Sequence, residues 1–186
     1  MRTLAITQNI TLDGSIEMLD NWFDDQAQGR EDNEDLLEEN ERQDSAADAL
    51  VVGRQTFEDF RGYWRDLEGD TTGISDYLNG VQKYVVSSTL TEPEWEPTTI
   101  LSGDPIAAVR SLKEEQGLDI VCTGSIKLSH ALLAAGLVDE LRLFVYPVVQ
   151  GRGRRLFPEG HQRGRAELLE ARQFRNGVGY LRYRLP

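Results

Sequence analysis

The sequence contains little of what several protein classes require. It has a single cysteine, Cys122, so an internal disulfide framework is excluded. That cysteine and two histidines, His130 and His161, leave few ligands for a transition metal, which predicts a metal-free protein. No apolar run approaches the roughly 20 residues of a membrane-spanning helix, and the N-terminal residues lack the apolar core of a signal peptide. We therefore expect a cytoplasmic protein without a membrane partner.

Charge is distributed unevenly along the chain. Residues 13–48 hold 14 acids and two bases, whereas residues 150–186 hold nine arginines and three acids. The net charge of −12 repels nucleic acid, so we expect no DNA or RNA partner. The acidic segment is compatible with a lid, an interface or a salt-adapted surface. With 186 residues, of which 39% are hydrophobic, the chain predicts one domain over residues 1–186.

Short apolar runs alternate with polar or helix-capping segments. Asp104 and Pro105 suit the first positions of a helix, and Gly117 suits its C-terminal cap. A second helix is predicted to end at Gly136, and the polar residues 31–49 are interpreted as a solvent-facing helix. Strands are predicted at residues 4–10, 49–52, 84–86, 98–101, 119–122 and 141–149.

Two strand-like segments near the C-terminus are separated by a turn. Residues 165–174 and 178–185 flank Asn176 and Gly177, a pair typical of a two-residue hairpin. The preceding alternation of strands and helices is typical of a parallel sheet covered by helices. The sequence therefore predicts an α/β fold with a mixed, mostly parallel sheet and an antiparallel C-terminal hairpin.

Three clusters of glycine, arginine and hydroxyl side chains each follow a predicted strand. They are Gly53, Arg54 and Thr56, then Ser87 and Ser88, then Thr123, Gly124 and Ser125. Phosphates bind backbone N–H groups at helix starts, and a 2′-phosphate binds arginine and hydroxyl groups. Each cluster alone is compatible with an ordinary turn. Because the carboxyl ends of parallel strands meet at one edge, where ligands bind, the three together predict a nucleotide site.

Several motifs resemble those of dihydrofolate reductase-like proteins, in the same order. They are Thr11-Leu12-Asp13-Gly14, residues 52–58, residues 84–88 and residues 124–128. Residues 135–143, 147–153 and 155–157 are more similar to the reductase domain of bacterial riboflavin biosynthesis and its stand-alone relatives. The resemblance covers nearly the whole chain. It implies the three-layer dihydrofolate reductase-like fold and NADPH-dependent reduction of a small carbonyl or heterocyclic substrate, pterin-like or pyrimidine-like.

The resemblance also implies roles for the clustered residues. The family's Gly-Arg-x-Thr motif, here beginning at Gly53, implies that Arg54 contacts the 2′-phosphate and Thr56 the pyrophosphate. The hydroxyls after the next strand imply that Ser87 and Ser88 flank the adenosine phosphate. The family's glycine loop cradles the pyrophosphate, which implies a cofactor-binding role for Thr123, Gly124, Ser125, Ile126 and Lys127.

Two positions depart from the family pattern. Riboflavin-pathway reductases place a substrate-contacting glutamate where this chain has Cys122, which argues against the ribosylaminopyrimidine substrate. Dihydrofolate reductases have a cis Gly-Gly peptide where this chain has Thr123-Gly124. A cis bond before a non-proline residue costs about 2.5–4 kcal/mol, and threonine narrows the backbone choices. Of the two geometries we expect the trans bond, with Ser125 as the cap of the following helix.

Reduction of a C=N or C=O bond also needs a proton, from a carboxylic acid of raised pKa or from water. Dihydrofolate reductases use an acid on the helix before the Gly-Arg-x-Thr motif. Asp35 is the match here, although it also fits a solvated acidic face. Asp13 lies nearer the expected nicotinamide position, although it also suits the turn before Gly14. Trp22 and Phe23 are candidates for the wall of the substrate pocket or for the core.

Two functions therefore stay open. One is an NADPH-dependent oxidoreductase similar to dihydrofolate reductase or 5-amino-6-(5-phosphoribosylamino)uracil reductase. The other is a non-catalytic, regulatory module that binds NADP(H) or a nucleotide, which the missing glutamate at Cys122 favours. The resemblance also implies a homodimer. The apolar residues 141–146 independently predict a sheet face or edge that needs cover.

Overall fold

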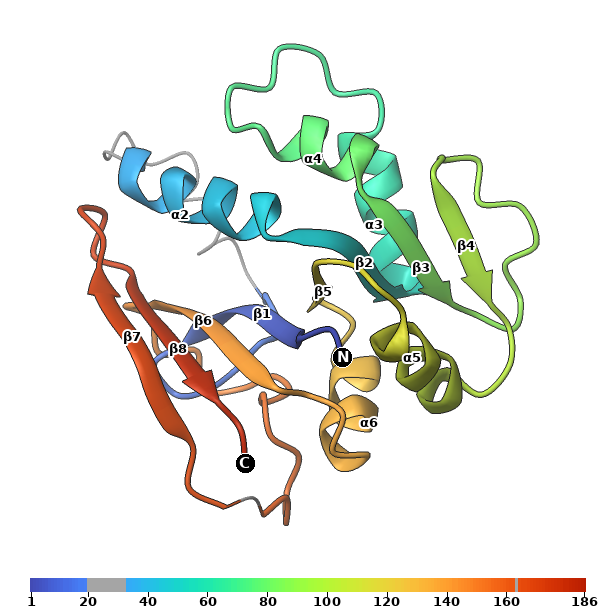
Figure 1. Ribbon diagram of the computed structural model, residues 1–186. Coiled ribbons are helices and arrows are strands. Elements are labelled where there is room, and N and C mark those ends of the chain that lie inside the picture. Colours follow the sequence, from blue (N-terminus) through green and yellow to red (C-terminus); the bar gives the residue numbers. More distant parts are fainter. Residues whose placement is uncertain (20–32, 163) are drawn as a thin grey trace.

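A central sheet with helices on both faces forms the framework of the molecule (Figure 1). The computed structural model describes residues 1–19, 33–162 and 164–186, and in these residues eight strands form the sheet. The strand order is β4-β3-β2-β5-β1-β6-β8-β7. The strands are β1 (Leu4–Thr11), β2 (Ala47–Gly53), β3 (Gln82–Val86), β4 (Thr98–Leu101), β5 (Asp119–Thr123), β6 (Glu140–Tyr146), β7 (Glu167–Gln173) and β8 (Gly179–Arg184).

Helices on the two faces bury separate apolar clusters. On one face, Leu132 of α6 packs in a cluster with Leu4 of β1. On the other face, Phe57 of α3 clusters with Leu50 of β2, and Leu36 of α2 packs against the aromatic residues of β6 and β8. Burial of each such side chain contributes about 1.5–3 kcal/mol. The helices are α2 (Glu34–Ser45), α3 (Arg54–Trp64), α4 (Ile74–Gly80), α5 (Pro105–Glu114) and α6 (Ile126–Ala134).

The pairing of the strands confirms the predicted mixed sheet. Strand β1 pairs in parallel with both β5 and β6, and β2 pairs in parallel with both β3 and β5. Strand β8 pairs antiparallel with β6 and with β7. The parallel part therefore brings the carboxyl ends of β1, β2, β3 and β5 to one edge of the sheet, while the hairpin extends the sheet on the far side.

Strand β6 is shorter and more enclosed than the sequence predicts. It ends at Tyr146 rather than at residue 149, because Pro147 has no backbone N–H to extend the ladder. It lies between β1 and β8, which cover its edges, and Leu141, Leu143, Phe144 and Tyr146 are buried within the chain. The prediction that residues 141–146 need cover from a partner is therefore wrong, and the expected homodimer keeps only the family resemblance as its support.

Helix α2, which lies in the acidic segment, is not simply solvent-facing. Glu39 is 0% exposed and Gln43 is 7% exposed. Arg42 of α2 and Arg172 of β7 donate hydrogen bonds to the Glu39 carboxylate, and Thr7 of β1 donates one to Gln43. The interpretation of residues 31–49 as a solvent-facing helix is therefore wrong for one side of α2. The Glu39 carboxylate can be buried there because arginines compensate its charge.

Helix α5 begins as predicted but ends earlier. The Asp104 carboxylate accepts hydrogen bonds from the first backbone N–H groups, and Pro105 occupies the first helical position. The helix ends at Glu114, so Gly117 is not its cap. A Cβ atom on Gly117 would lie 2.8 Å from the Arg2 guanidinium, so glycine there permits a close approach instead.

Helix α6 ends where the sequence predicts. Gly136 has a φ of 69°, in the left-handed region that favours glycine. Its N–H donates to the Leu133 carbonyl, and the N–H of Leu137 donates to the Leu132 carbonyl. These two bonds form a Schellman motif, which satisfies carbonyls that the helix end leaves open.

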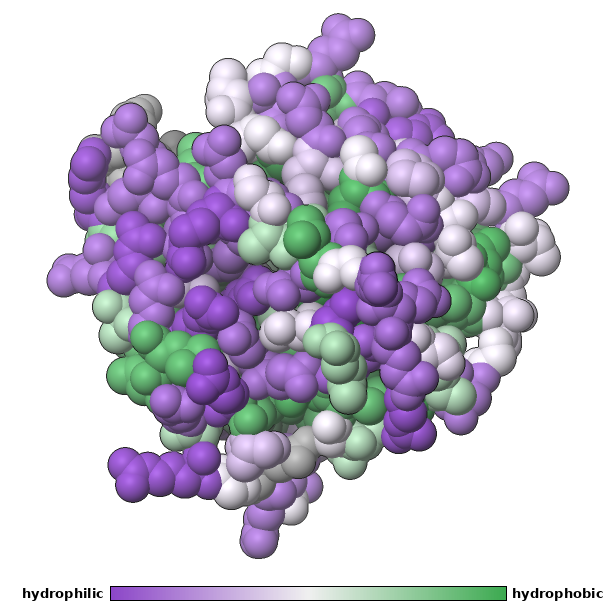
Figure 2. Space-filling model, viewed as in Figure 1, coloured by the Kyte–Doolittle hydropathy of each residue, from purple (hydrophilic) through white to green (hydrophobic). Residues whose placement is uncertain are grey.

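Most of the molecular surface is polar in the view of Figure 1. Figure 2 shows hydrophilic residues over most of this face, with apolar residues in small separate groups. Among the described residues, no helix combines the length and the apolar character that crossing a membrane requires.

Candidate functional site

The structure brings the three clusters to the same edge of the sheet. Gly53 is the last residue of β2, Thr123 is the last of β5, and Ser87 directly follows β3. Strand β2 lies between β3 and β5, so the ends of neighbouring strands carry the clusters. This is the arrangement that the sequence predicts, and at the carboxyl edge of parallel strands it is typical of a ligand site.

Side-chain hydroxyl and amide groups link two of the clusters. The Gly53 N–H donates to the Ser125 hydroxyl over 2.8 Å, and the Ser125 N–H donates to the Thr56 hydroxyl over 2.9 Å. The Gln8 amide donates to the Gly124 carbonyl over 2.7 Å. We call these five residues the hydroxyl cradle. Its bonds join segments 69 to 116 residues apart in sequence, so they fix the start of α3 against the start of α6.

The backbone of the cradle turns sharply at Gly124. Gly124 and Ser125 have φ angles of 56° and 45°, both in the left-handed region. A Cβ atom on Gly124 would lie 2.9 Å from the Thr56 methyl group, so this position requires glycine for space as well as for conformation. The peptide between Thr123 and Gly124 is trans, which confirms the expected geometry.

The start of α6 lacks a side-chain cap. Ser125 occupies the N-cap position, but its side chain makes no capping hydrogen bond. The prediction that its hydroxyl caps α6 is wrong, because that hydroxyl accepts from Gly53 instead. Helices leave their first N–H groups without partners inside the helix, and here those of Ile126 and Lys127 are among them. Such groups, aligned with the helix dipole, attract an anion.

A pocket of about 340 Å³ adjoins Arg54 at the ends of β3 and β4. Its Ser87 hydroxyl accepts hydrogen bonds from the N–H groups of Thr89 and Leu90, so it also stabilises the turn. Ser88 is exposed. The polar part of the lining is one guanidinium and several hydroxyls, which suits a phosphate. The lining residues are Arg54, Val86, Ser87, Ser88, Thr89, Leu101, Ser102 and Gly103.

Asp13 is placed to hold a loop rather than to supply a proton. Its carboxylate accepts hydrogen bonds from the Thr11 hydroxyl and from the backbone N–H groups of Gln150 and Gly151. These bonds favour the ionised form and lower the pKa of Asp13 to about 2. At neutral pH the group carries no proton, so the structure argues against Asp13 as the predicted proton donor.

Asp35 lies apart from the cradle. It is in the first turn of α2, and its carboxylate accepts a hydrogen bond from the Arg175 N–H in the turn between β7 and β8. Three strands, β1, β6 and β8, separate β7 from β5 in the sheet. The structure therefore does not join Asp35 to the clusters, and a structural role fits its contacts. The other two predicted pocket residues, Trp22 and Phe23, lie outside the described residues.

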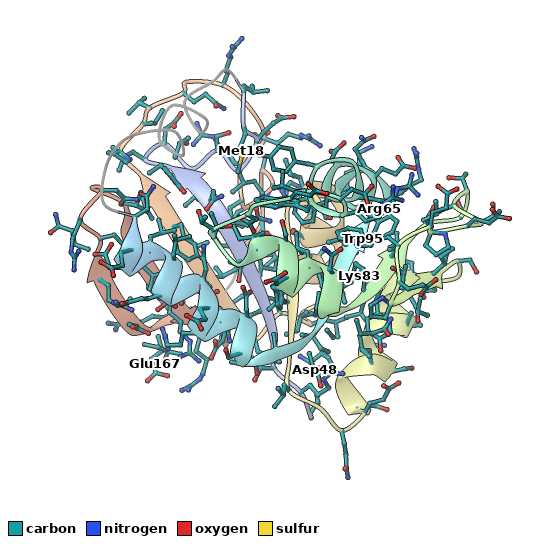
Figure 3. The ribbon with its side chains drawn as sticks, turned by 90° about the horizontal axis from the view of Figure 1, so that it is seen from above. Met18, Asp48, Arg65, Lys83, Trp95 and Glu167 are labelled. Carbon is teal, nitrogen blue, oxygen red and sulfur yellow. The ribbon has the colours of Figure 1, made fainter. Side chains whose placement is uncertain are left out.

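Residues of β1 that the sequence motifs do not single out line the same edge. Thr7 and Asn9 alternate with the buried Ile6 and Ile10, so they face α2, and both are partly exposed although β1 lies inside the sheet. Figure 3 shows β1 passing between α2 and α4. The signal that could have found them is polarity: Thr7, Gln8 and Asn9 are hydrophilic in a strand that both faces should bury.

Comparisons with known proteins point to one family. A family model described as the RibD C-terminal domain matches residues 2–180. An uncharacterized protein of Bacillus subtilis, YyaP, is 30% identical over 138 residues, which are 73% of this chain and 73% of that protein.

Solved structures share the fold at low sequence identity. A pyrimidine reductase-like protein of Corynebacterium diphtheriae has a TM-score of 0.68 and 18% identity, and covers 100% of this chain and 92% of its own. A diaminohydroxyphosphoribosylaminopyrimidine deaminase/5-amino-6-(5-phosphoribosylamino)uracil reductase of Thermotoga maritima has a TM-score of 0.67 and 14% identity. The match covers 100% of this chain and 57% of that one. These likenesses confirm the predicted fold.

Proposed function

The chain belongs to the RibD C-terminal domain family, and from that premise we propose that it is an NADPH-dependent reductase of a small heterocyclic or carbonyl substrate. The observation that carries the proposal is the meeting of Arg54, the exposed Ser88 and the uncapped start of α6 at one sheet edge. Charge and hydrogen-bond donors for two separate phosphate positions of a dinucleotide lie there.

The residues at this edge fit the chemistry of NADPH. Arg54 and Ser88 would hold the 2′-phosphate, and the N–H groups of Ile126 and Lys127 would hold the pyrophosphate. The hydroxyl cradle would orient those N–H groups, because Thr56 fixes the Ser125 backbone from the neighbouring helix. NADPH supplies a hydride when it is bound.

The substrate would lie over β1, beside the nicotinamide end of the cofactor. Thr7 and Asn9 offer hydroxyl and amide groups there, which suit a neutral ring with amide-like edges, such as a pterin or a pyrimidine. Cys122 is fully buried against Ser129 on the face that carries α6, so no acid reaches the substrate from that position. We therefore propose a substrate other than the ribosylaminopyrimidine of riboflavin biosynthesis.

The proton for the reduced atom would come from water. Asp13 is ionised, and Asp35 is held at the hairpin turn. The partial exposure of Thr7 and Asn9 leaves the reacting edge open to solvent, so water can reach it. If water supplies the proton, the pH profile of the reduction rate should show no step from a carboxylic acid between pH 5 and pH 8.

A nucleotide-binding module without turnover is the second candidate. The observation that favours it is the state of Asp13: a group with a pKa of about 2 cannot act as the acid at neutral pH. The two candidates share the cofactor site and differ only in chemistry. A homodimer is also proposed, on the family resemblance alone, and light scattering at micromolar concentration tests it.

Titration and turnover together separate the candidates. NADPH fluorescence measures binding, and loss of NADPH absorbance with a panel of pterins, pyrimidines and small carbonyl compounds measures reduction. Binding with oxidation by at least one compound supports the reductase. Binding without oxidation by any of them supports the module. Absence of binding contradicts both.

Arg54 provides the sharpest variant of the cofactor site. Arg54→Ala removes the guanidinium from the hydroxyl-lined pocket, so the Kd for NADPH should rise about tenfold or more, with a smaller change for NADH. Arg65→Ala is the matched control, because Arg65 is an exposed arginine at the end of the same helix that pairs with Asp66. An equal loss of affinity for NADPH and NADH would contradict the assignment of Arg54 to the 2′-phosphate.

A further inference from the structure

Arg54 stands between two pockets of different character. One is the hydroxyl-lined pocket of about 340 Å³ described above. The other, of about 500 Å³, shares Arg54 and Thr89 with the first and is lined largely by charged side chains. Its residues are Arg54, Glu58, Arg61, Thr89, Leu90, Thr91, Glu92 and Glu94. Contacts that the Arg54 guanidinium makes in one pocket therefore compete with contacts that it makes in the other.

In the structure the guanidinium is engaged by Glu58. The Nη1 atom of Arg54 donates to both carboxylate oxygens of Glu58, over 2.8 Å and 3.0 Å. The two residues are four apart in α3, so they lie on the same face of the helix. The side chain of Arg54 is 46% exposed and that of Glu58 is 29% exposed. Packing therefore does not fix Arg54, and the ion pair with Glu58 determines where it points.

The remaining charges around Arg54 do not compensate Glu58. Arg61 donates to Glu94 and to the Pro93 carbonyl, so its charge is already shared with another acid. Of the charged residues that line the larger pocket, three are acids and two are arginines. The lining of the larger pocket, which shares Arg54 with the proposed phosphate pocket, therefore has a net charge of −1, and Glu58 in that lining is already bonded to the arginine that the phosphate would contact.

We propose that Glu58 is a specificity-determining residue, which competes with the 2′-phosphate for Arg54 and so narrows the preference for NADPH over NADH. The inference rests on the proposed function, because it needs a dinucleotide at this edge. A phosphate with a charge of about −2 is repelled by the neighbouring carboxylate, whereas the ribose hydroxyl of NADH is neutral. Glu58 therefore weakens the binding of NADPH selectively.

The opposite role for Glu58 is distinguishable. If its main effect were to hold Arg54 in a productive position, loss of its charge would weaken NADPH binding. Glutamine keeps the size of the side chain and an oxygen that accepts from Nη1, but it carries no charge. Glu58→Gln thus isolates the charge from the positioning. Asp59→Asn is the matched control, because Asp59 lies on the same helix and accepts a hydrogen bond from the neutral Gln55.

The experiment measures the Kd of the wild type, Glu58→Gln and Asp59→Asn for NADPH and for NADH at low ionic strength. We expect Glu58→Gln to tighten NADPH about threefold to tenfold and to leave NADH within twofold, with Asp59→Asn unchanged for both. Unchanged or weaker NADPH binding by Glu58→Gln, or equal gains for both cofactors, would overturn the inference. Failure of the wild type to bind either dinucleotide would overturn the proposed function itself, and is a separate outcome.

Discussion

The hydroxyl cradle and the hairpin side of the sheet are held together by different forces. The cradle uses hydrogen bonds between neutral groups of Gln8, Gly53, Thr56, Gly124 and Ser125. The hairpin side uses carboxylates and arginines that come from α2, β5, β6, β7 and β8, which we call the arginine–carboxylate block. The block residues are Glu39, Arg42, Asp119, Glu140, Arg142, Glu170, Arg172 and Arg182.

The block is built around two buried carboxylates. Glu39 accepts hydrogen bonds from Arg42 and Arg172, and Glu140 accepts them from Arg142 and Arg182. Burial raises the pKa of Glu140, but the bonds from Arg182 and the charge of Arg142 outweigh that effect, so its pKa lies below the usual value. Both carboxylates are engaged by two arginines each, which makes them structural groups.

The comparison shows that this chain places its buried ion pairs in the block and not in the cradle. The acidic segment and the arginine-rich C-terminal segment meet in the block, as in the pairs Arg42–Glu170 and Arg172–Glu39. Part of the acidic segment is therefore engaged by contacts within the chain, in the residues that the structure describes. The proposed site depends instead on backbone N–H groups, hydroxyls and one arginine. If that division is right, damage to the block should change stability while cofactor binding by the folded protein is retained.

The largest expected effect comes from Arg142→Met. The Arg142 side chain is 4% exposed and contacts Glu140 and Asp119, so its loss leaves Asp119 without this arginine and Glu140 with Arg182 alone. We expect the free energy of unfolding to fall by about 3–5 kcal/mol in chemical denaturation. The folded fraction should still bind NADPH with the wild-type Kd.

Arg184→Met is the matched control for this variant. Arg184 of β8 pairs with Glu167 of β7, but the two side chains are 57% and 63% exposed. An exposed pair contributes about 0–1 kcal/mol, so the control should unfold almost like the wild type. A similar loss for both variants, or a weaker Kd in the folded Arg142→Met protein, would break the division between block and cradle.

The second effect comes from Gly124→Ala, which damages the cradle. Alanine would have to adopt a positive φ and place its Cβ 2.9 Å from the Thr56 methyl group. We expect a loss of stability of about 2–3 kcal/mol, together with weaker binding of NADPH because the N–H groups after Gly124 move.

Gly177→Ala separates the backbone cost of a positive φ from the steric cost, which Gly124→Ala combines. Gly177 has a φ of 84° in the hairpin turn, but a Cβ atom there would meet nothing beyond its chain neighbours within 4 Å, so only the backbone cost of about 1 kcal/mol applies. Its Kd for NADPH should equal that of the wild type. Thermal unfolding and NADPH titration of both variants check the prediction. Weaker NADPH binding by Gly177→Ala would show that the cradle and the hairpin are coupled.

The smallest effect concerns Asp44, near the end of α2. Burial, with a smaller contribution from Glu41, raises the pKa of Asp44 from 3.8 to about 7. Between these values the folded state binds the proton more tightly than the unfolded state, so this group's contribution to stability falls as pH rises to about 7. Asp44→Asn removes that loss. Because Asp44 is only partly buried, we expect a gain of about 1 kcal/mol at pH 8 and a smaller gain at pH 5.

Thermal unfolding at the two pH values measures this gain, with Asp66→Asn as the control at an exposed carboxylate that is 75% accessible. The control should not become more stable between pH 5 and pH 8. An Asp44→Asn gain that does not grow with pH would contradict the raised pKa.

Sequence patterns predict the fold and the clusters because both depend on local signals. Apolar runs, the Asp104 cap and the Asn176-Gly177 turn are each read within a few residues, and the parallel order then brings the cluster positions to one edge. The burial of Glu39 could not be predicted in this way. It depends on Arg172, which lies 133 residues away in sequence, and helix patterning treats a run of acids as solvated.

The details of the site escaped prediction for the same reason. The Ser125 hydroxyl can cap its own helix or accept from Gly53, and only the approach of the end of β2 to the start of α6 decides between them. Asp13 occupies a turn in which two N–H groups from residues 150–151 converge on its carboxylate, which removes it as a proton donor. Such long-range hydrogen bonds leave no periodic signal in the sequence.

The central claim is that the start of α6 and the cradle bind the phosphates of NADPH, and amide NMR tests it most directly. With NADP⁺ at a concentration that saturates binding by an independent assay, the N–H signals of residues 123–127 should shift. Those of Gly177 and Arg184, in the hairpin, should stay in place. Unchanged signals for residues 123–127 at saturation would contradict the account.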